Sequence, residues 1–376
     1  MNATKSQTDS KGYQTEELLR NYFLKAGYFV VRGAPFTYSG FAVTDVDLWL
    51  YNRVSPVSRE ISIVDIKSKR TPQAIERIFW TKGLQAALGV SRAMVATTEN
   101  RPEVRKFGKD LDVLVLDGRF LRRLSEASPS LKSRITDEEL RGLLVEANVA
   151  KKIDGDWMGR ILESKGKLLA GLSFDNINYW LSQAHFFVEQ VLSRETRREL
   201  GLRCFYLTAS FTSLAVDYIL RDLSFLDEGD REKVLRDGFI YGERGQSGTR
   251  SVIDTSVSLI EQFTDRGLSI GSEIRRRIND EIERVPANIL SQFFARNDTA
   301  RVLFDTSREM ESFAMARAFQ SHAGASTNMR SIIGCLLDFW GVDRKAFAGE
   351  SSQLSLESLS PIEPTSEAVE SAKSGI

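Results

Sequence analysis

The sequence contains few of the residues on which most metal sites and nucleophilic sites are built. Its 376 residues include two cysteines, Cys204 and Cys335, and two histidines, His185 and His322. Each cysteine lies in an apolar stretch with helical spacing, so the pair predicts neither a disulfide framework nor a zinc cluster. Because histidine is this scarce, we expect carboxylates and lysines to carry out any catalysis.

The sequence also lacks the hydrophobic runs of membrane and secreted proteins. No apolar stretch approaches the roughly 20 residues needed to cross a bilayer, and residues 1–14 are polar, without the apolar core of a signal peptide. Hydrophobic residues make up 42% of the chain and charged residues 27%, which is typical of a globular protein. We therefore expect a soluble, cytoplasmic protein with no membrane partner.

An excess of one charge sign is absent overall, since 51 Lys and Arg balance 51 Asp and Glu. The charges are nevertheless unevenly spread. Residues 1–125 hold 20 basic against 13 acidic residues, whereas residues 348–376 hold one lysine against five glutamates. A basic N-terminal part suits a polyanionic partner such as DNA, although a solvated basic surface is equally compatible with this excess.

The chain is too long for one ordinary core, and its hydrophobic pattern changes near residue 127. We predict a disordered N-terminus (1–12), an α/β domain (13–126), an all-α domain (127–347) and a disordered, acidic, Ser-rich tail (348–376). The expected elements of the α/β domain, in chain order, are a helix over 14–27, strands over 28–35 and 41–52, a third strand in the stretch 59–70, a helix from Thr71-Pro72 to Gly89, a strand over 91–98, a helix over 103–109, a strand over 112–118 and a final helix starting at FLRRL. Short turns join the first three strands and helices join the later ones, which predicts a mixed sheet flanked by helices.

Acidic residues and a lysine recur on three consecutive elements of this domain. Glu16 and Glu17 open the first helix; Asp45 and Asp47 share one face of the second strand; Asp65 and Lys67 share one face of the third. Carboxylates on adjacent strands are oxygen ligands of the kind that Mg²⁺ prefers, and the Ile66 carbonyl between Asp65 and Lys67 can complete such a site. A lysine beside the metal can orient or deprotonate a water molecule and neutralise charge on a phosphate.

Residues 12–125 resemble the PD-(D/E)xK nuclease superfamily, and within it the Mrr-like restriction endonuclease domains. The resemblance is carried by TEELLRNYFLKAGYFVV with Glu16, by DVDL with Asp47, by Asp65-Ile66-Lys67, and by the downstream VATT and LDGRFLRRL. It implies a restriction-endonuclease-like fold and metal-dependent DNA cleavage in restriction or defence. Mg²⁺, replaceable by Mn²⁺, would be held by Asp47, Asp65 and the Ile66 carbonyl, with Lys67 and Glu16 as further catalytic residues.

Other interpretations of the same residues remain open. Asp65 and Lys67 could form a plain salt bridge, and Glu16 and Glu17 could be first-turn acids favoured by the helix dipole. Gln85, seven residues after Ile78, could share the inward helix face and assist at the site, and Lys69 could contact a backbone phosphate; both are auxiliary candidates.

The helical domain contains no motif that we can interpret, so its partner stays open. A double-strand break usually needs two active sites, and we therefore expect a homodimer. The alternatives to a restriction nuclease are a catalytically silent DNA-binding or regulatory protein with the nuclease fold, and a repair or junction nuclease of that fold.

Overall fold

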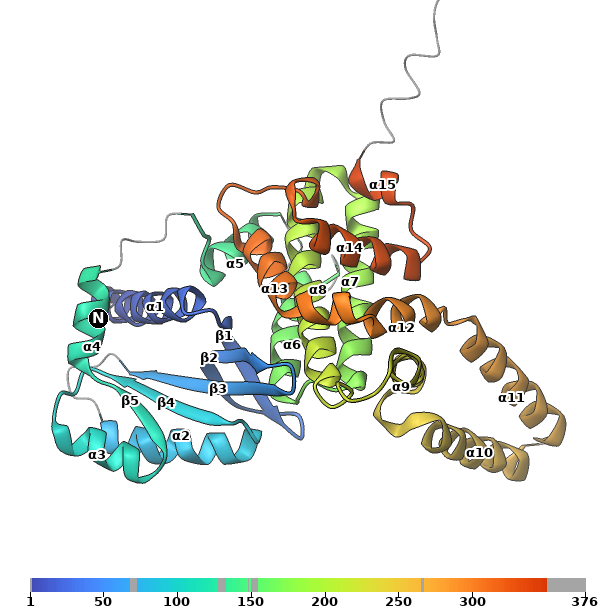
Figure 1. Ribbon diagram of the computed structural model, residues 1–376, viewed down its shortest axis with the longest axis horizontal. Coiled ribbons are helices and arrows are strands. Elements are labelled where there is room, and N and C mark those ends of the chain that lie inside the picture. Colours follow the sequence, from blue (N-terminus) through green and yellow to red (C-terminus); the bar gives the residue numbers. More distant parts are fainter. Residues whose placement is uncertain are drawn as a thin grey trace, which may run out of the picture.

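The computed structural model describes residues 2–67, 73–127, 133–147, 149, 155–264 and 267–349, with side chains from Tyr13 onward. An α/β part ends at Ala127 and is followed by helices, which lie beside the sheet (Figure 1). The expected combination of a mixed sheet and a helical part is therefore present. The predicted tail lies outside the described residues from residue 350 onward.

The sheet has five strands in the order β1-β2-β3-β4-β5. The first three pair antiparallel, whereas β3, β4 and β5 pair parallel. Their bounds are β1 (Phe29–Tyr38), β2 (Phe41–Ser55), β3 (Ser58–Lys67), β4 (Arg92–Thr97) and β5 (Val113–Leu116). Since β3 is the central strand, Asp65 and Lys67 lie near the middle of the sheet, at the end of that strand.

Helices cover both faces of the sheet. Helices α1 (Asn2–Lys25) and α4 (Gly118–Ala127) pack on one face, over a core that includes Leu48, Val64 and Met94. Helices α2 (Ala74–Leu88) and α3 (Pro102–Asp110) pack on the other face, on the side of β3, β4 and β5. This arrangement follows from the alternation of apolar residues on strands that are buried on both faces.

Helix α1 begins further toward the N-terminus than the sequence pattern indicated. It spans Asn2–Lys25 instead of starting near residue 14, so residues 2–12, expected to be disordered, continue the helix. No proline interrupts this stretch and Gly12 is its one glycine, so nothing in the local sequence forces a break.

The remainder of the described chain is helical. In chain order the elements are α5 (Asp137–Glu146), α6 (Trp157–Leu169), α7 (Phe174–Ser193), the 3₁₀ turn Glu195–Arg197, α8 (Arg198–Leu220), α9 (Glu228–Tyr241), the 3₁₀ turn Gly242–Arg244, α10 (Gly245–Phe263), α11 (Gly267–Arg284), α12 (Ala287–Ala295), α13 (Asn297–Met315), the 3₁₀ turn His322–Gly324, α14 (Thr327–Phe339) and α15 (Arg344–Ala348). Over the described ranges, none of the helices combines the length and the apolar character that crossing a membrane would take.

The helical part shares one hydrophobic core with the sheet. Phe29 of β1 contacts Phe211 of α8 with ring centroids 6.2 Å apart, and Tyr51 of β2 contacts Phe304 of α13 at 5.7 Å. All four residues belong to the same cluster of apolar side chains. The two predicted domains are therefore packed against each other through the face of β1 and β2 that α2 and α3 leave uncovered.

Two groups of buried charges reinforce this junction. Asp217 of α8 is fully buried and accepts hydrogen bonds from Arg59 and Tyr51 of the sheet. Arg20 of α1 is 2% exposed and pairs with Asp137 of α5 and Glu311 of α13. Such pairs are stable in the interior only while every partner is present.

Candidate active site

Asp47 and Asp65 lie where β2 and β3 separate. The antiparallel pairing of the two strands reaches Leu48 opposite Val64, so Asp47 and Asp65 are the next residue on each strand. At this point the carboxylate oxygen Oδ2 of Asp47 accepts a hydrogen bond of 2.6 Å from the backbone N–H of Ile66. The side chain of Asp47 is thereby hydrogen-bonded to the middle residue of the Asp65-Ile66-Lys67 motif.

The orientation of β3 determines what faces Asp47. The N–H and C=O groups of one strand residue point toward the same neighbouring strand. Because the Ile66 N–H reaches Asp47, the Ile66 carbonyl also points to the side of β2, beyond the end of the paired region. Asp65 and Lys67 alternate with Ile66 and therefore project from the same face as Ile63, toward α2.

The environment of Asp47 disfavours its ionised form. Burial raises the pKa of Asp47 above its ordinary value of 3.8, against the opposing effects of the Ile66 N–H, Lys67 and Arg77. A carboxylate is unusual in the interior when its hydrogen bonds and neighbouring positive charges do not offset the cost of its burial, unless it binds a cation.

Asp65 has a partner that the sequence analysis did not find. Both of its carboxylate oxygens bind the guanidinium of Arg77 in the first turn of α2; the bond from Nε to Oδ2 measures 2.7 Å and the second joins Nη2 to Oδ1. Within the described residues, no ion pair joins Asp65 to Lys67, so the plain salt bridge between these two is not formed. No local pattern pointed to Arg77, because its contact depends on how α2 packs on β3.

Glu16 lies close enough to Asp47 for their charges to interact, and it is paired with Arg32 of β1. The Nε of Arg32 donates to Glu16 at 2.7 Å, and Nη1 of the same guanidinium donates to Glu17 at 2.7 Å. Burial raises the pKa of Glu16, Arg32 lowers it, and the negative charges of Asp47 and Glu138 add to the rise. Both glutamates therefore have tertiary partners and are not simply solvated first-turn acids.

A cavity of about 280 Å³ opens beside these residues at the junction of the two parts. Glu16, Asp45 and Asp47 contribute its acidic wall, whereas Met158 and Ile161 of α6 contribute to an apolar wall. Asp45 is exposed, as expected of a residue outside the innermost shell of ligands.

Gly33 of β1 lines the same cavity and interrupts the strand opposite Asp47. It has a φ of 60°, and Gly33 and Asp47 are not paired, although Arg32 pairs with Leu48 on one side of them and Ala34 with Val46 on the other. A Cβ at Gly33 would meet no atom within 4 Å, so the glycine is required by its backbone conformation and not by crowding. Gly33 therefore lines the cavity next to Asp47 without contributing a side chain to it.

The auxiliary candidates do not join this group. Gln85 is buried, as its spacing from Ile78 indicated, but its side-chain Nε2 donates to the Ser91 carbonyl at 3.1 Å. Ser91 binds the backbone of Ile61 near the start of β3. Helix α2 runs opposite to β3, so Gln85 lies at the far end of the strand from Asp65. Lys69 lies outside the described residues.

The oxygen donors at the strand ends match the needs of Mg²⁺. Among the described residues, no group of three His, Cys, Asp or Glu side chains is placed to hold a metal ion. Mg²⁺ nevertheless keeps several water ligands and is commonly bound through one or two carboxylates. Asp47, Asp65 and the Ile66 carbonyl are oxygen donors of that kind, and both carboxylate oxygens of Asp65 are bound to Arg77.

Comparisons with known proteins identify no family for this chain. No protein-family model matches it, and neither a curated protein nor a solved structure gives a significant match. Its function must therefore be argued from its own residues and geometry.

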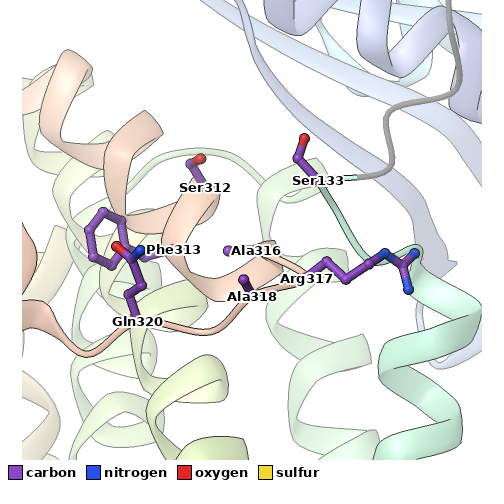
Figure 2. Close-up of a pocket in the computed structure, with 7 residues that line it drawn as sticks. All are labelled: Ser133, Ser312, Phe313, Ala316, Arg317, Ala318 and Gln320. Atoms are coloured by element: carbon purple, nitrogen blue, oxygen red, sulfur yellow. The ribbon is translucent and has the colours of Figure 1, made fainter.

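A second cavity, of about 440 Å³, lies between Ser133 and the C-terminal end of α13 (Figure 2). Its lining includes Ser312, Phe313 and Gln320, and the side chain of Arg317 extends away from them. The Arg317 guanidinium instead binds Glu139 and the Arg134 carbonyl. With no carboxylate or histidine among its described lining residues, this cavity offers neither a base for a serine nor ligands for a metal.

Proposed function

We propose that the protein is a metal-dependent DNA endonuclease of the PD-(D/E)xK type, with its active site at the ends of β2 and β3. The observation that carries the proposal is the contact between Asp47 and Ile66. It places the Asp of one strand next to the Asp-x-Lys motif of the neighbouring strand.

The order of the elements also supports the proposal. The α/β part runs from α1 through three antiparallel strands to α2, β4, α3, β5 and α4. This is the order that the resemblance to the nuclease superfamily implies, with the glutamate on the first helix and the two acidic motifs on the second and third strands. A restriction-endonuclease-like fold is accordingly part of the proposal.

Each residue has a distinct role in the proposed reaction. Asp47, Asp65 and the Ile66 carbonyl would hold Mg²⁺ or Mn²⁺, and the bound ion would supply charge stabilisation and an acidified water molecule. Lys67 orients that water and neutralises charge on the phosphate from the end of β3. Glu16 lines the cavity next to Asp47, is held there by Arg32, and would assist at the site as a further carboxylate.

A role in restriction or defence, with a homodimer delivering two cuts, belongs to the same proposal. The helical part would then supply recognition, regulation or dimer contacts, and it already forms one wall of the cavity next to Asp47.

One observation favours a second candidate function, a silent DNA-binding protein that keeps the nuclease fold. The guanidinium of Arg77 occupies both oxygens of Asp65, and a protein that had lost its metal would be stabilised by such a replacement. In that case the protein binds DNA with a salt-dependent affinity and does not cleave it, whichever divalent ion is present.

The test is a cleavage assay on linear, branched, modified and unmodified DNA, with and without Mg²⁺. We expect metal-dependent nicking or cutting that Lys67→Ala lowers by at least about 100-fold while the melting temperature stays unchanged. Lys82→Ala, which removes an exposed lysine from α2, is the matched control and should cleave normally. Equal cleavage by the Lys67→Ala and wild-type proteins would reject the assignment, and binding without cleavage would select the silent alternative. Preference for branched DNA would identify a repair or junction nuclease.

A further inference from the structure

Arg77 occupies an unusual position for a basic residue. It lies in the first turn of α2, where the helix dipole favours acidic side chains and disfavours a positive charge. Within the part of the chain that the structure describes, the hydrogen bonds from its side chain go to Asp65, the residue expected to bind the metal. The position of Arg77 is therefore explained by the site and not by the helix.

The contact with Arg77 competes with any metal that would bind Asp65. The guanidinium binds both carboxylate oxygens, and its charge also interacts with Asp47. Mg²⁺ binds carboxylate oxygens at about 2.0–2.1 Å. An ion at that distance would share the oxygens that Arg77 binds and would place two positive charges side by side.

Arg77 is also able to leave. Its side chain is 24% exposed, whereas that of Asp65 is 9% exposed. The guanidinium lies 5.8 Å from the centre of the Trp80 ring, which is itself 43% exposed. The carboxylate is thus held in place by β3, while the arginine reaches it from the surface.

We infer that Arg77 exchanges partners, binding Asp65 in the metal-free protein and a DNA phosphate once a divalent cation occupies Asp65. The inference rests on the proposed function, which it extends by one catalytic residue. A planar guanidinium suits both partners, because it forms paired hydrogen bonds with carboxylates and with phosphates. The released arginine remains in the first turn of α2, beside the two carboxylates and Lys67.

The first measurement is Mn²⁺ binding in the absence of DNA, by electron paramagnetic resonance. Arg77→Ala should bind Mn²⁺ about tenfold or more tightly than the wild type, because the metal no longer has to break charge-assisted hydrogen bonds. Arg77→Lys should fall between the two, since lysine keeps the charge but lacks the paired donors. Lys82→Ala removes one positive charge from the same helix and should bind Mn²⁺ almost as the wild type does.

The second measurement is DNA binding in Mg²⁺, with Lys67→Ala present in every protein to prevent cleavage. Adding Arg77→Ala should weaken DNA binding several-fold, and by more than adding Lys82→Ala does. If Arg77→Ala does not fold, Arg77→Lys provides both comparisons.

If Arg77→Ala binds Mn²⁺ as weakly as the wild type, Arg77 and the metal do not compete for Asp65. If adding Arg77→Ala leaves the DNA affinity unchanged, Arg77 does not bind a DNA phosphate. Neither readout depends on cleavage. If the wild-type protein cleaves no DNA and Arg77→Ala nevertheless binds Mn²⁺ more tightly than the wild type, the nuclease function is refuted. The competition between Arg77 and the metal for Asp65 is then still supported.

Discussion

The Asp217 cluster provides a quantitative test of how the sheet and the helices are joined. Asp217 of α8 is fully buried and accepts hydrogen bonds from Tyr51 Oη at 2.6 Å, Arg59 Nε at 2.6 Å and Arg59 Nη2 at 3.0 Å. The side chain of Arg59 is only 1% exposed. In Asp217→Ala the buried Tyr51 hydroxyl and the buried Arg59 guanidinium lose this carboxylate at once, and so does Arg53, although Arg59 keeps hydrogen bonds to backbone carbonyls.

The expected effect is large because the remaining charge stays in the interior. Removing one partner of a buried ion pair typically costs about 3–5 kcal/mol, which is a substantial part of a total stability of about 5–15 kcal/mol. We expect the free energy of unfolding in urea, followed by circular dichroism and by tryptophan fluorescence, to fall by that amount. Because Trp49 lies in the sheet and Trp180 in α7, both signals should report a single transition.

Asp222→Ala is the matched control. Asp222 lies just beyond the end of α8, its side chain is 66% exposed, and it pairs with Arg221. Exposed pairs contribute about 0–1 kcal/mol, so this variant should be nearly as stable as the wild type. A loss in Asp217→Ala no greater than that in Asp222→Ala would refute the view that this cluster holds the two parts together.

Three further outcomes follow from the structure. Burial raises the pKa of Asp47, so the folded protein keeps this proton at pH values where the unfolded chain has lost it, and stability falls as pH rises from 3.8 through the folded pKa. Asp47→Asn should therefore melt at a higher temperature than the metal-free wild type at pH 7, and this difference should vanish below pH 3.8. The same variant should not cleave DNA, because it lacks the proposed metal ligand. A lower melting temperature of Asp47→Asn at pH 7 would contradict the stability prediction. Mn²⁺ affinity, titrated at several pH values, should fall as pH decreases toward the raised pKa of Asp47, since the proton and the metal compete for one carboxylate; a flat profile would argue against Asp47 as a ligand. A Cβ at Gly166 of α6 would lie 2.9 Å from the Pro35 carbonyl oxygen of β1, so Gly166→Ala should lower the free energy of unfolding in urea by about 1–3 kcal/mol. A Cβ at Gly142 of α5 meets no atom within 4 Å, so Gly142→Ala should raise the free energy of unfolding by about 0.4–1 kcal/mol.

The sequence was most informative where structure is decided locally. Apart from the start of α1, the alternation of apolar residues and the position of Gly89 placed the helices and strands of the α/β part near their observed bounds, as with β4 (Arg92–Thr97) against the expected 91–98. The same alternation correctly put Asp65 and Ile63 on one face of β3. These features depend on neighbours within a few residues, so they can be read from the order of residues alone.

Features that depend on packing between distant segments could not be predicted. Gln85 was correctly expected on the inward face of α2, but helix periodicity does not say which end of β3 that face meets. The pairing of Asp65 with Arg77 depends on the same docking. The contact of Arg59 with Asp217 joins residues 158 positions apart, and no local pattern marks either partner.

The shared core has a practical consequence for dissecting this protein. A fragment that ends at Ala127 would uncover Phe29 and Tyr51 on the exposed face of the sheet, and it would leave Arg59 without a carboxylate to bind. The shortest piece that retains the partners of Arg20 has to extend through α13, which supplies Glu311. The α/β part cannot be exchanged between proteins as a free-standing module, so a hybrid protein built on it must carry the helices along.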